Sequence, residues 1–480
     1  MHLSARFFIQ LVFGVAATGA AFAAQAFDAA AWREDFAQAR SELARAYANL
    51  DWVVSDRKVD LKALVARTEA ELGRATSDKE AAQALKQFLD AFGDGHVRML
   101  PPARAAAAVA QTDSAPATAS CRDLGFRARP DKPLDFAAAE QFEPLANDDA
   151  ALLPAGVLKA GGRKLGVIRI GLFSEHNFPL LCERELAQAA GCDRACQQRL
   201  FTRAGKELTR LLARQVTALR ARSIDALVID ITGNGGGTNW AEAAARVVTG
   251  PGLLAPRVAF IKHPHWVKGL AARIDDIDRD LKRESLPAAQ KAWLTAARMR
   301  LAAARERASE PCDRSAIWDN RPVCPLAVAG TLHTVGLDAE PAPLDFDGYE
   351  AEWVHNNLAT YEAVSAWNGP LAVLVDGNTA SAAELFAATL KDSGRATLIG
   401  SRTYGSGCGY TDGGIPITLK RSGVQLKVPD CVRLRADGSN EVAGIAPDVA
   451  IGWQRGDAAA ARATLATAAL ADWATSNFKR

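Results

Sequence analysis

Apolar positions follow two different periods along the chain, and they predict helices first and strand–helix units later. Residues 27–92 carry apolar side chains at three- and four-residue spacing, as in DFAQARSELARAYANL, which is typical of amphipathic helices. Three short apolar runs indicate buried strands, because they are rich in β-branched residues and lie between turn residues. These runs are residues 164–170 (KLGVIRI), 224–231 (IDALVIDI) and 371–375 (LAVLV).

Two of these predicted strands lead through a loop into a helix. The glycine-rich residues 232–238 follow the second strand, and residues 240–248 have a helical pattern. Turn residues DGN follow the third strand, a helix begins at Ala380, and another strand is predicted at residues 396–400. Alternating strands and helices predict an α/β fold built from βαβ units.

Residues 256–368 interrupt this alternation and are predicted to form an insertion. Within them, residues 274–307 are highly charged and helical in pattern, and a break near Pro287 predicts a helical hairpin with a solvated face. The other predicted segments are an N-terminal helical domain at 27–100, a linker and unassigned segment at 101–160, a core formed by 161–255 and 369–455, and a C-terminal helix at 456–480.

The N-terminus has the three-part pattern of a signal peptide. Arg6 precedes the apolar run FFIQLVFGVAATGAAFA, and small residues allow cleavage after Ala23 or Ala26. An uncleaved membrane anchor is the alternative, which the short apolar run disfavours. We therefore expect a periplasmic or secreted protein, with residues 1–26 removed and no membrane contact afterwards. A net charge of +2 gives no indication of a nucleic-acid partner.

Eight cysteines in an exported chain predict disulfide bonds. Sequence alone does not determine how they pair. Proximity favours Cys312 with Cys324, Cys192 with Cys196, and Cys408 with Cys431, which leaves Cys121 for Cys182. A zinc site at the Cys192 and Cys196 pair is the alternative, but no matching cysteine or histidine pair lies nearby.

Ser381 lies at the predicted strand-to-helix turn. Backbone N–H groups at a helix start are unpaired and favour negative charge, which suits a nucleophile that develops an oxyanion beside it. The alternative is a capping box, because Ser381 and Glu384 fit the S-x-x-E pattern that satisfies helix-start donors.

The glycine loop that begins at Asp230 (DITGNGGG) has several interpretations. A dinucleotide loop would need glycine where Thr238 stands, and a phosphate-binding P-loop would need G-K-[ST]. An oxyanion site is compatible with the sequence, because glycines let backbone N–H groups point together without side-chain obstruction. A tight structural turn is the alternative.

Together, the two stretches resemble the serine peptidases of family S41, the tail-specific (C-terminal processing) and tricorn-core group. Residues 379–405 (TASAAELFAATLKDSGRATLIGSRTYG) are similar to the nucleophile segment of that family, and DITGNGGG is similar to its D-L-R-x-N-x-G-G loop. KLGVIRI resembles its opening strand and GIAPD its closing turn. The resemblance implies a ClpP/crotonase-like core, Ser381 as the nucleophile, and the N–H of Ala382 with that of Gly236 or Gly237 as oxyanion donors.

The sequence departs from that family at the general base. Processing peptidases of the family carry a lysine in T-F-G-K-G, whereas residues 403–407 here read TYGSG and place Ser406 at that position. Lys420 and Lys427 lie well beyond the motif. The tricorn-type branch uses a Ser–His–Glu arrangement, and by this resemblance His96 would be the base and Glu441 would fix its tautomer.

Each of these assignments has an alternative. His96 would otherwise be a turn histidine bonded to backbone, and Glu441 a loop carboxylate. His176 is the second candidate for the base, and His263 with His265 could form a surface metal pair. Residues 97–163 lack a recognisable carboxylate-binding loop, so we expect no complete PDZ module and leave recognition of substrate C-termini open.

The resemblance therefore implies a serine peptidase that acts on peptides or unfolded proteins through an acyl-enzyme and needs no metal or organic cofactor. A non-catalytic protein that binds peptides or small ligands on the same fold is the alternative that the missing lysine suggests. An esterase using the same triad is a third reading, because acyl transfer to water needs the same groups.

Overall fold

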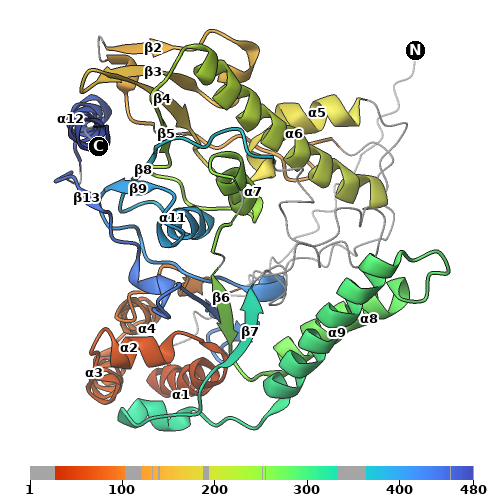
Figure 1. Ribbon diagram of the computed structural model, residues 1–480. Helices are drawn as coiled ribbons and strands as arrows, with labels where there is room; N and C mark the ends of the chain where they lie inside the picture. Colours follow the sequence, from red (N-terminus) through yellow and green to blue (C-terminus); the bar gives the residue numbers. More distant parts are fainter. Residues whose placement is uncertain are drawn as a thin grey trace, which may run out of the picture.

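The computed structural model describes residues 27–102, 120–131, 133–138, 141–187, 194–250, 252–254, 256–331, 364–454 and 456–478. Figure 1 shows an upper body built on one large sheet and a lower body of helices with two small sheets. The predicted signal peptide, residues 1–26, lies outside the described residues. Within the described ranges, every helix is too short or too polar to cross a membrane.

A seven-stranded mixed sheet forms the upper body. Its strands are β2 (Phe142–Pro144), β3 (Ala155–Ala160), β4 (Arg163–Arg169), β5 (Ala226–Asp230), β8 (Leu371–Val375), β9 (Thr397–Gly400) and β13 (Val449–Ala450). Their spatial order is β13-β9-β8-β5-β4-β3-β2, with β4 to β13 parallel and β2 and β3 antiparallel at one edge. The three apolar runs of the sequence are the central strands β4, β5 and β8, because parallel strands are buried on both faces.

Helices cover both faces of this sheet (Figure 1). They are α5 (Pro179–Leu186), α6 (Arg194–Ala221), α7 (Trp240–Val247), α11 (Ala382–Asp392) and α12 (Ala459–Asn477). Alternate side chains of β5 enter different hydrophobic clusters: Leu227 and Ile229 pack with α6, α7 and α11, whereas Val228 packs with α12. This arrangement confirms the predicted α/β fold class.

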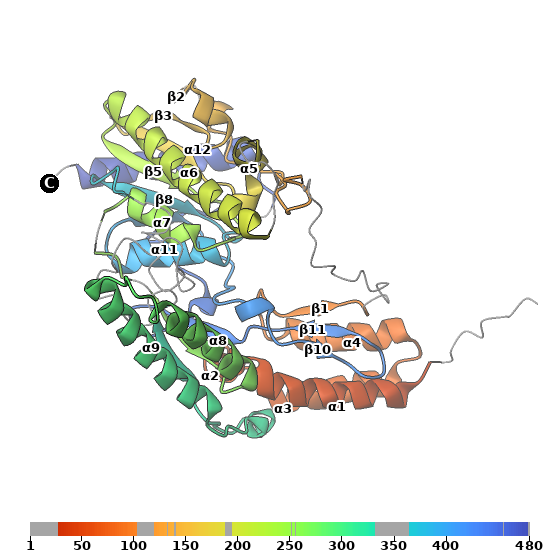
Figure 2. The same cartoon turned by 90° about the vertical axis from the view of Figure 1, so that its right-hand side faces the viewer.

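The lower body combines segments that are far apart in the sequence (Figure 2). Its helices are α1 (Ala29–Ala46), α2 (Leu50–Ser55), α3 (Leu61–Arg74), α4 (Asp78–Asp90), α8 (Pro264–Asp280) and α9 (Ala288–Ser309). Its two three-stranded sheets have the orders β1-β11-β10 and β12-β6-β7. The strands are β1 (Arg98–Leu100), β6 (Arg257–Phe260), β7 (Ala327–Thr331), β10 (Ile417–Thr418), β11 (Gln425–Lys427) and β12 (Cys431–Leu434). One hydrophobic cluster joins them all, so the N-terminal helices share a core with residues 408–442.

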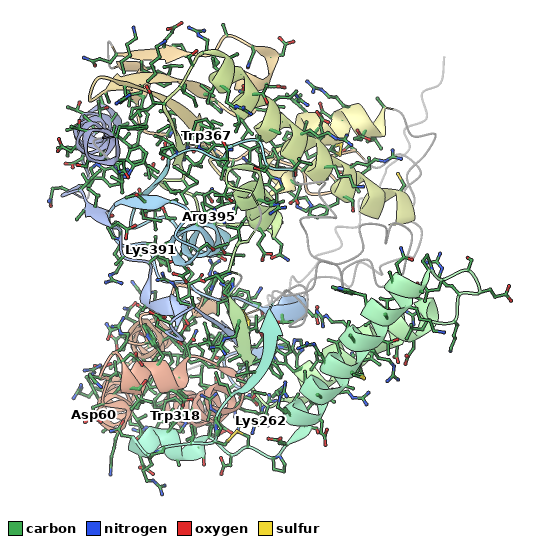
Figure 3. The ribbon with its side chains drawn as sticks, viewed as in Figure 1. Asp60, Lys262, Trp318, Trp367, Lys391 and Arg395 are labelled. Carbon is green, nitrogen blue, oxygen red and sulfur yellow. A yellow bond between two sulfur atoms is a disulfide. The ribbon has the colours of Figure 1, made fainter. Side chains whose placement is uncertain are left out.

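The insertion is packed against the N-terminal helices rather than standing apart from them. Trp318 Nε1 donates a hydrogen bond to Arg40 O over 3.1 Å, and Asn320 Nδ2 donates to Asp60 Oδ1 over 2.8 Å. Figure 3 shows Trp318 and Asp60 together at the base of the lower body. The predicted hairpin is present as α8 and α9, and short 3₁₀ helices complete the described chain: η1 (Phe136–Ala138), η2 (Asp148–Ala151), η3 (Glu175–Asn177), η4 (Ser315–Asp319), η6 (Thr411–Gly413) and η7 (Glu441–Ala443).

Three of the predicted disulfide bonds are present in the structure. They join Cys121 to Cys182, Cys312 to Cys324 and Cys408 to Cys431. Cys196 is also disulfide-bonded. Its predicted partner, Cys192, lies outside the described residues, so that pairing stays a prediction.

Candidate active site

Ser381 lies at the turn between β8 and α11, where the strand becomes a helix. Its backbone has φ 56° and ψ −115°. Such strained conformations cost a non-glycine residue on the order of 1–3 kcal/mol and cluster at functional sites. A serine on a sharp strand-to-helix turn is typical of nucleophiles, because the turn exposes its Oγ. Ala380 N–H donates to Asn234 O over 2.9 Å and holds this turn against the glycine loop.

Glu384 fixes the same turn from inside the protein, where it is fully buried. Ser381 N–H donates to Glu384 Oε2 over 2.9 Å, so this half of the capping box is present. The carboxylate also accepts hydrogen bonds from Thr403 Oγ1 at 2.6 Å, Gly405 N–H at 2.7 Å and Ser406 N–H at 2.9 Å. Starting the helix and presenting a nucleophile are therefore compatible roles for Ser381, and Glu384 ties its turn to the loop after β9.

His96 is held by contacts to its backbone and to its ring. His96 N–H donates to Asp94 Oδ1 over 2.8 Å, and Asn49 Nδ2 donates to Asp94 Oδ2 over 2.8 Å. Nδ1 of His96 lies 2.8 Å from Ser406 O. Because a carbonyl oxygen only accepts, Nδ1 carries the proton and Nε2 keeps its lone pair.

Burial keeps the His96 ring neutral. It lowers the pKa of His96 to about 4, outweighing the hydrogen bond to Ser406 O, and the positive charge of Arg433 lowers it further. Burial also raises the pKa of Asp94 to about 6. At neutral pH, the imidazole is therefore a proton acceptor, as a general base must be.

Ser381 and His96 line the same cavity, which has a volume of about 800 Å³ and lies between the upper and lower bodies. The glycine loop contributes Gly237 to its wall, and α8 of the insertion contributes Arg273. The other lining residues are Asn239, Gly269, Ala272, Asp276, Cys408, Gly409, Tyr410, Thr411, Asp412, Cys431 and Arg433. The cavity is therefore built from the N-terminal helical domain, the core and the insertion.

The glycine loop packs directly against the Ser381 turn. A Cβ atom at Gly236 would lie 2.7 Å from Ala382 N, so a side chain there would require displacement. Gly236 N–H donates to Asn234 Oδ1 over 2.9 Å, which takes this amide out of use as an oxyanion donor. Gly237 has φ 140° and lines the cavity. Of the two glycines considered, Gly237 is therefore the stronger candidate beside Ala382.

Glu441 is fully buried and forms an ion pair with Arg433 of β12. Arg433 Nη2 also donates to Ser381 O over 2.8 Å. Burial raises the pKa of the Glu441 carboxyl to about 7, although the Arg433 charge opposes the shift. The described residues contain no hydrogen bond from Glu441 to His96, and Ser406 O takes that place on Nδ1. The structure thus connects Glu441 to Ser381 through Arg433.

The second candidate for the base lies elsewhere. The ring of His176 packs against Phe126 and Phe201, with ring centroids 4.8 Å and 5.1 Å away. Neither His176 nor the two lysines beyond the motif, Lys420 and Lys427, is among the residues that line the Ser381 cavity.

The histidine pair at the start of the insertion has other partners. His263 is buried and hydrogen-bonded to the Arg45 side chain, and His265 Nε2 lies 2.8 Å from Thr411 O. In the part of the chain that the structure describes, no group of three or more potential ligands is placed to hold a metal ion.

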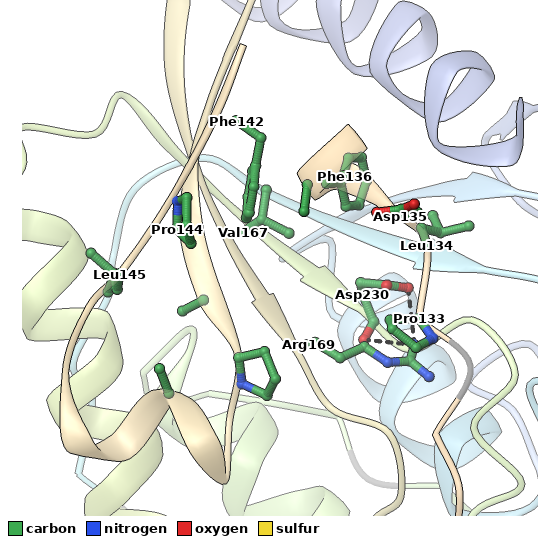
Figure 4. Close-up of a pocket in the computed structure, with 14 residues that line it drawn as sticks. Pro133, Leu134, Asp135, Phe136, Phe142, Pro144, Leu145, Val167, Arg169 and Asp230 are labelled. Atoms are coloured by element: carbon green, nitrogen blue, oxygen red, sulfur yellow. Dashed lines mark hydrogen bonds and ion pairs between the residues drawn. The ribbon is translucent and has the colours of Figure 1, made fainter. Parts of the chain in front are cut away.

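Asp230 supports the glycine loop rather than the cavity of Ser381. Its Oδ1 lies 3.2 Å from Arg169 Nη1 and accepts a hydrogen bond from Thr232 N–H over 2.9 Å. Figure 4 shows this pair at the edge of a second cavity of about 370 Å³, whose lining includes neither Ser381 nor His96. The ion pair thus fixes where the glycine loop leaves β5.

Two contributors to the site were not predicted as such. Asn234 lies inside the glycine motif, where its side-chain amide accepts a hydrogen bond from Gly236 N–H and donates one to Ile170 O. The sequence signal for this role was an amide side chain, which can both donate and accept, within a glycine loop. Arg433 was missed because the residues around it have the pattern of an ordinary strand. The one sequence signal was a charged side chain among the apolar residues of that strand, since charged residues are rarely buried without a partner.

Known solved structures share this fold. The structure of mature CPAF complexed with lactacystin matches with a TM-score of 0.57 at 13% identity, covering 93% of this chain and 98% of that chain. The crystal structure of mature CPAF gives a TM-score of 0.53 at 13% identity, with coverages of 93% and 96%.

Sequence comparison finds matches that are shorter but have a higher sequence identity. The carboxyl-terminal-processing peptidase 3, chloroplastic, of Arabidopsis thaliana is 37% identical over 83 residues, covering 16% of this chain and 16% of the relative. The carboxyl-terminal-processing protease of Picosynechococcus sp. is 40% identical over 83 residues, covering 16% of this chain and 20% of the relative. The chain thus matches a fifth or less of the length of these relatives. The sequence model of peptidase family S41 matches residues 164–451, more than half of the chain, and this protein therefore belongs to peptidase family S41.

Proposed function

We propose that this protein is a serine peptidase that hydrolyses peptide bonds through an acyl-enzyme on Ser381, with His96 as the general base. The observation that carries the proposal is the shared cavity: a strained serine, a neutral histidine and Gly237 all line it. Family membership supports the same chemistry.

In this proposal, His96 Nε2 accepts the Ser381 hydroxyl proton while Oγ attacks the carbonyl carbon of the substrate. The N–H groups of Gly237 and Ala382 stabilise the oxyanion that forms. The tetrahedral intermediate collapses, the C–N bond breaks, and His96 gives its proton to the leaving amine. Water then repeats the sequence on the acyl-enzyme and releases the acid.

Ser406 and Glu441 position the reacting groups. Ser406 O fixes the tautomer of His96 through Nδ1, a role that triads usually give to a carboxylate. Glu441 acts on the nucleophile through Arg433, which binds the backbone of Ser381. A lysine base is unnecessary in this arrangement, which accounts for Ser406 at the family's lysine position.

The proposed substrates are peptides or unfolded proteins outside the cytoplasm. A cavity of about 800 Å³ has room for several side chains of an extended chain. Disulfide bonds persist in oxidising compartments, and the predicted signal peptide leads to the same periplasmic or secreted location.

The direct test is reaction with a fluorophosphonate probe, followed by identification of the labelled peptide and by hydrolysis of an unfolded protein. Labelling at Ser381 together with peptide cleavage is the expected result. Labelling with cleavage of esters but not of peptides would favour the esterase. A folded protein that is not labelled would favour the binding protein.

Substitution of Gly237 by alanine is expected to slow fluorophosphonate labelling on the order of 100-fold or more, the usual effect of losing an oxyanion donor. A Cβ at Gly237 would lie 1.9 Å from Phe173 O at φ 140°, so the amide must move. Gly235→Ala is the matched control, because a Cβ there meets no atom within 4 Å. Equal labelling rates for the two folded variants would contradict this role.

The acid limb of kcat/KM for a peptide is expected near pH 4. Only neutral His96 can accept the serine proton, and its lowered pKa means that the neutral form persists above about pH 4 and is lost below it. An unperturbed histidine would place this limb near pH 6.5. The measurement is a pH–rate profile from about pH 3 to 8, with folding monitored by circular dichroism. A limb at the unperturbed value would contradict the lowered pKa of His96.

A further inference from the structure

The Cys408–Cys431 disulfide lies in the wall of the Ser381 cavity, since both cysteines line it. It joins the two segments that hold the reacting groups. Cys408 closely follows Ser406, whose carbonyl binds the His96 ring. Cys431 begins β12, the strand that carries Arg433 and thereby holds the Ser381 backbone. One covalent bond thus spans both halves of the site.

The segment that it anchors is rich in glycine, which makes its backbone costly to order. Residues 403–410 read TYGSGCGY, and Gly405 and Gly407 have φ 84° and φ 58°. Glycine loses more conformational freedom on ordering than any other residue, so the direction of the carbonyl between these two glycines is costly to fix. Glu384 holds the N-terminal side of this carbonyl. The disulfide holds the side that follows it.

The same segment surrounds His96. Ser406 O binds Nδ1, and a Cβ at Gly409 would lie 3.5 Å from Nε2. Tyr410 donates its hydroxyl to His96 O, and the two rings are 5.4 Å apart between centroids. A displacement of this segment would therefore change both the tautomer of His96 and the space beside its reactive nitrogen.

We propose that the Cys408–Cys431 disulfide is a positioning element for His96 and that the activity of the enzyme depends on its oxidation. This inference rests on the proposed function. A dithiol that enters through the cavity would pass two electrons and two protons to the S–S bond. The bond breaks, two thiols form, and the reductant ends as its own disulfide. The loop would then lose its covalent anchor on β12, and the reduced protein would be less active than the oxidised protein.

Cys312 and Cys324 provide a matched control within the chain. Their disulfide lies in the insertion, joins cysteines 12 residues apart where Cys408 and Cys431 are 23 apart, and does not line the Ser381 cavity. A general effect of losing one cross-link would appear in both pairs, whereas the proposed positioning effect would appear only at Cys408–Cys431.

The test compares wild type, Cys408→Ser/Cys431→Ser and Cys312→Ser/Cys324→Ser as full chains. Fluorophosphonate labelling rates and their pH dependence are measured before and after dithiothreitol, with thiols located by mass spectrometry. In wild type and the control, reduction of Cys408–Cys431 is expected to slow labelling at least about tenfold, since ångström-scale misplacement is costly. The Cys408→Ser/Cys431→Ser variant is expected to be slow from the start and insensitive to dithiothreitol.

Two further readouts are independent of activity. When this disulfide is absent, and only then, amide hydrogen exchange across residues 403–411 is expected to accelerate. Under the same condition, the His96 ring proton resonance is expected to titrate closer to pH 6.5. If wild type is never labelled, the proposed function fails while these readouts still decide the positioning. If the double variant does not fold, reduced wild type decides it. Wild-type labelling, exchange and titration after loss of this disulfide would overturn the proposal.

Discussion

Ser381→Ala is expected to abolish fluorophosphonate labelling and to lower peptide hydrolysis by at least about 10⁴-fold, the usual consequence of removing a serine nucleophile. The effect is large because the attacking atom itself is lost, whereas the oxyanion donors and substrate contacts remain. Labelling by mass spectrometry and hydrolysis of an unfolded protein measure it. Circular dichroism establishes that the variant is folded.

A second substitution at this position separates chemistry from stability. Ser381→Gly is expected to be as inactive as Ser381→Ala. Its free energy of unfolding is expected to be higher than that of Ser381→Ala by about 1 kcal/mol, because glycine adopts a positive φ without steric cost. The φ of 56° at Ser381 is therefore interpreted as strain maintained for function. Chemical denaturation compares the two variants. Residual labelling of folded Ser381→Ala would place the nucleophile at another residue.

His96→Ala is expected to slow labelling and hydrolysis on the order of 10³-fold or more, because the serine hydroxyl then lacks a base. His96→Gln keeps a side-chain amide that can donate to Ser406 O but cannot act as a base, and it is expected to be as slow as His96→Ala. This pair distinguishes loss of the base from collapse of the loop.

His176→Ala is the matched control, because His176 packs against two phenylalanines and does not line the Ser381 cavity. Its labelling rate is expected to stay within about threefold of wild type, as is usual for substitutions away from a site. Activity that survives in folded His96→Ala but is lost in His176→Ala would move the base to His176.

The central strands were predictable because their environment is uniform. β4, β5 and β8 have helices on both faces, so most of their side chains are apolar and the sequence shows nearly continuous apolar runs. β2 and β3 lie at the antiparallel edge of the sheet, and both are short strands of mixed composition. Their sequences carry no such run, so the pattern predicts no strand within the linker and unassigned segment at 101–160.

The nucleophile and the glycine loop were also predictable, since each depends on residues adjacent in the chain. The turn at Ser381 and the glycines after β5 are local conformations with local sequence requirements. His96 was reached only through family resemblance, because nothing around it in the sequence indicates that it lines the same cavity as Ser381. The cavity that contains both comes from the packing of the two bodies.

The amino-acid sequence by itself thus determined the fold class, the strand–turn–helix that presents Ser381, and the cysteines available for cross-linking. The tertiary structure alone decided what each group binds. It placed Ser406 O on the His96 ring, Arg433 between Glu441 and Ser381, and Gly236 N–H on Asn234. Most of these contacts involve a backbone atom or join residues far apart in the chain, and contacts of these kinds leave no periodic or motif signature in the sequence. Only the tertiary structure reveals them. In it, the buried Glu384 carboxylate joins the Ser381 turn to the loop that carries Ser406.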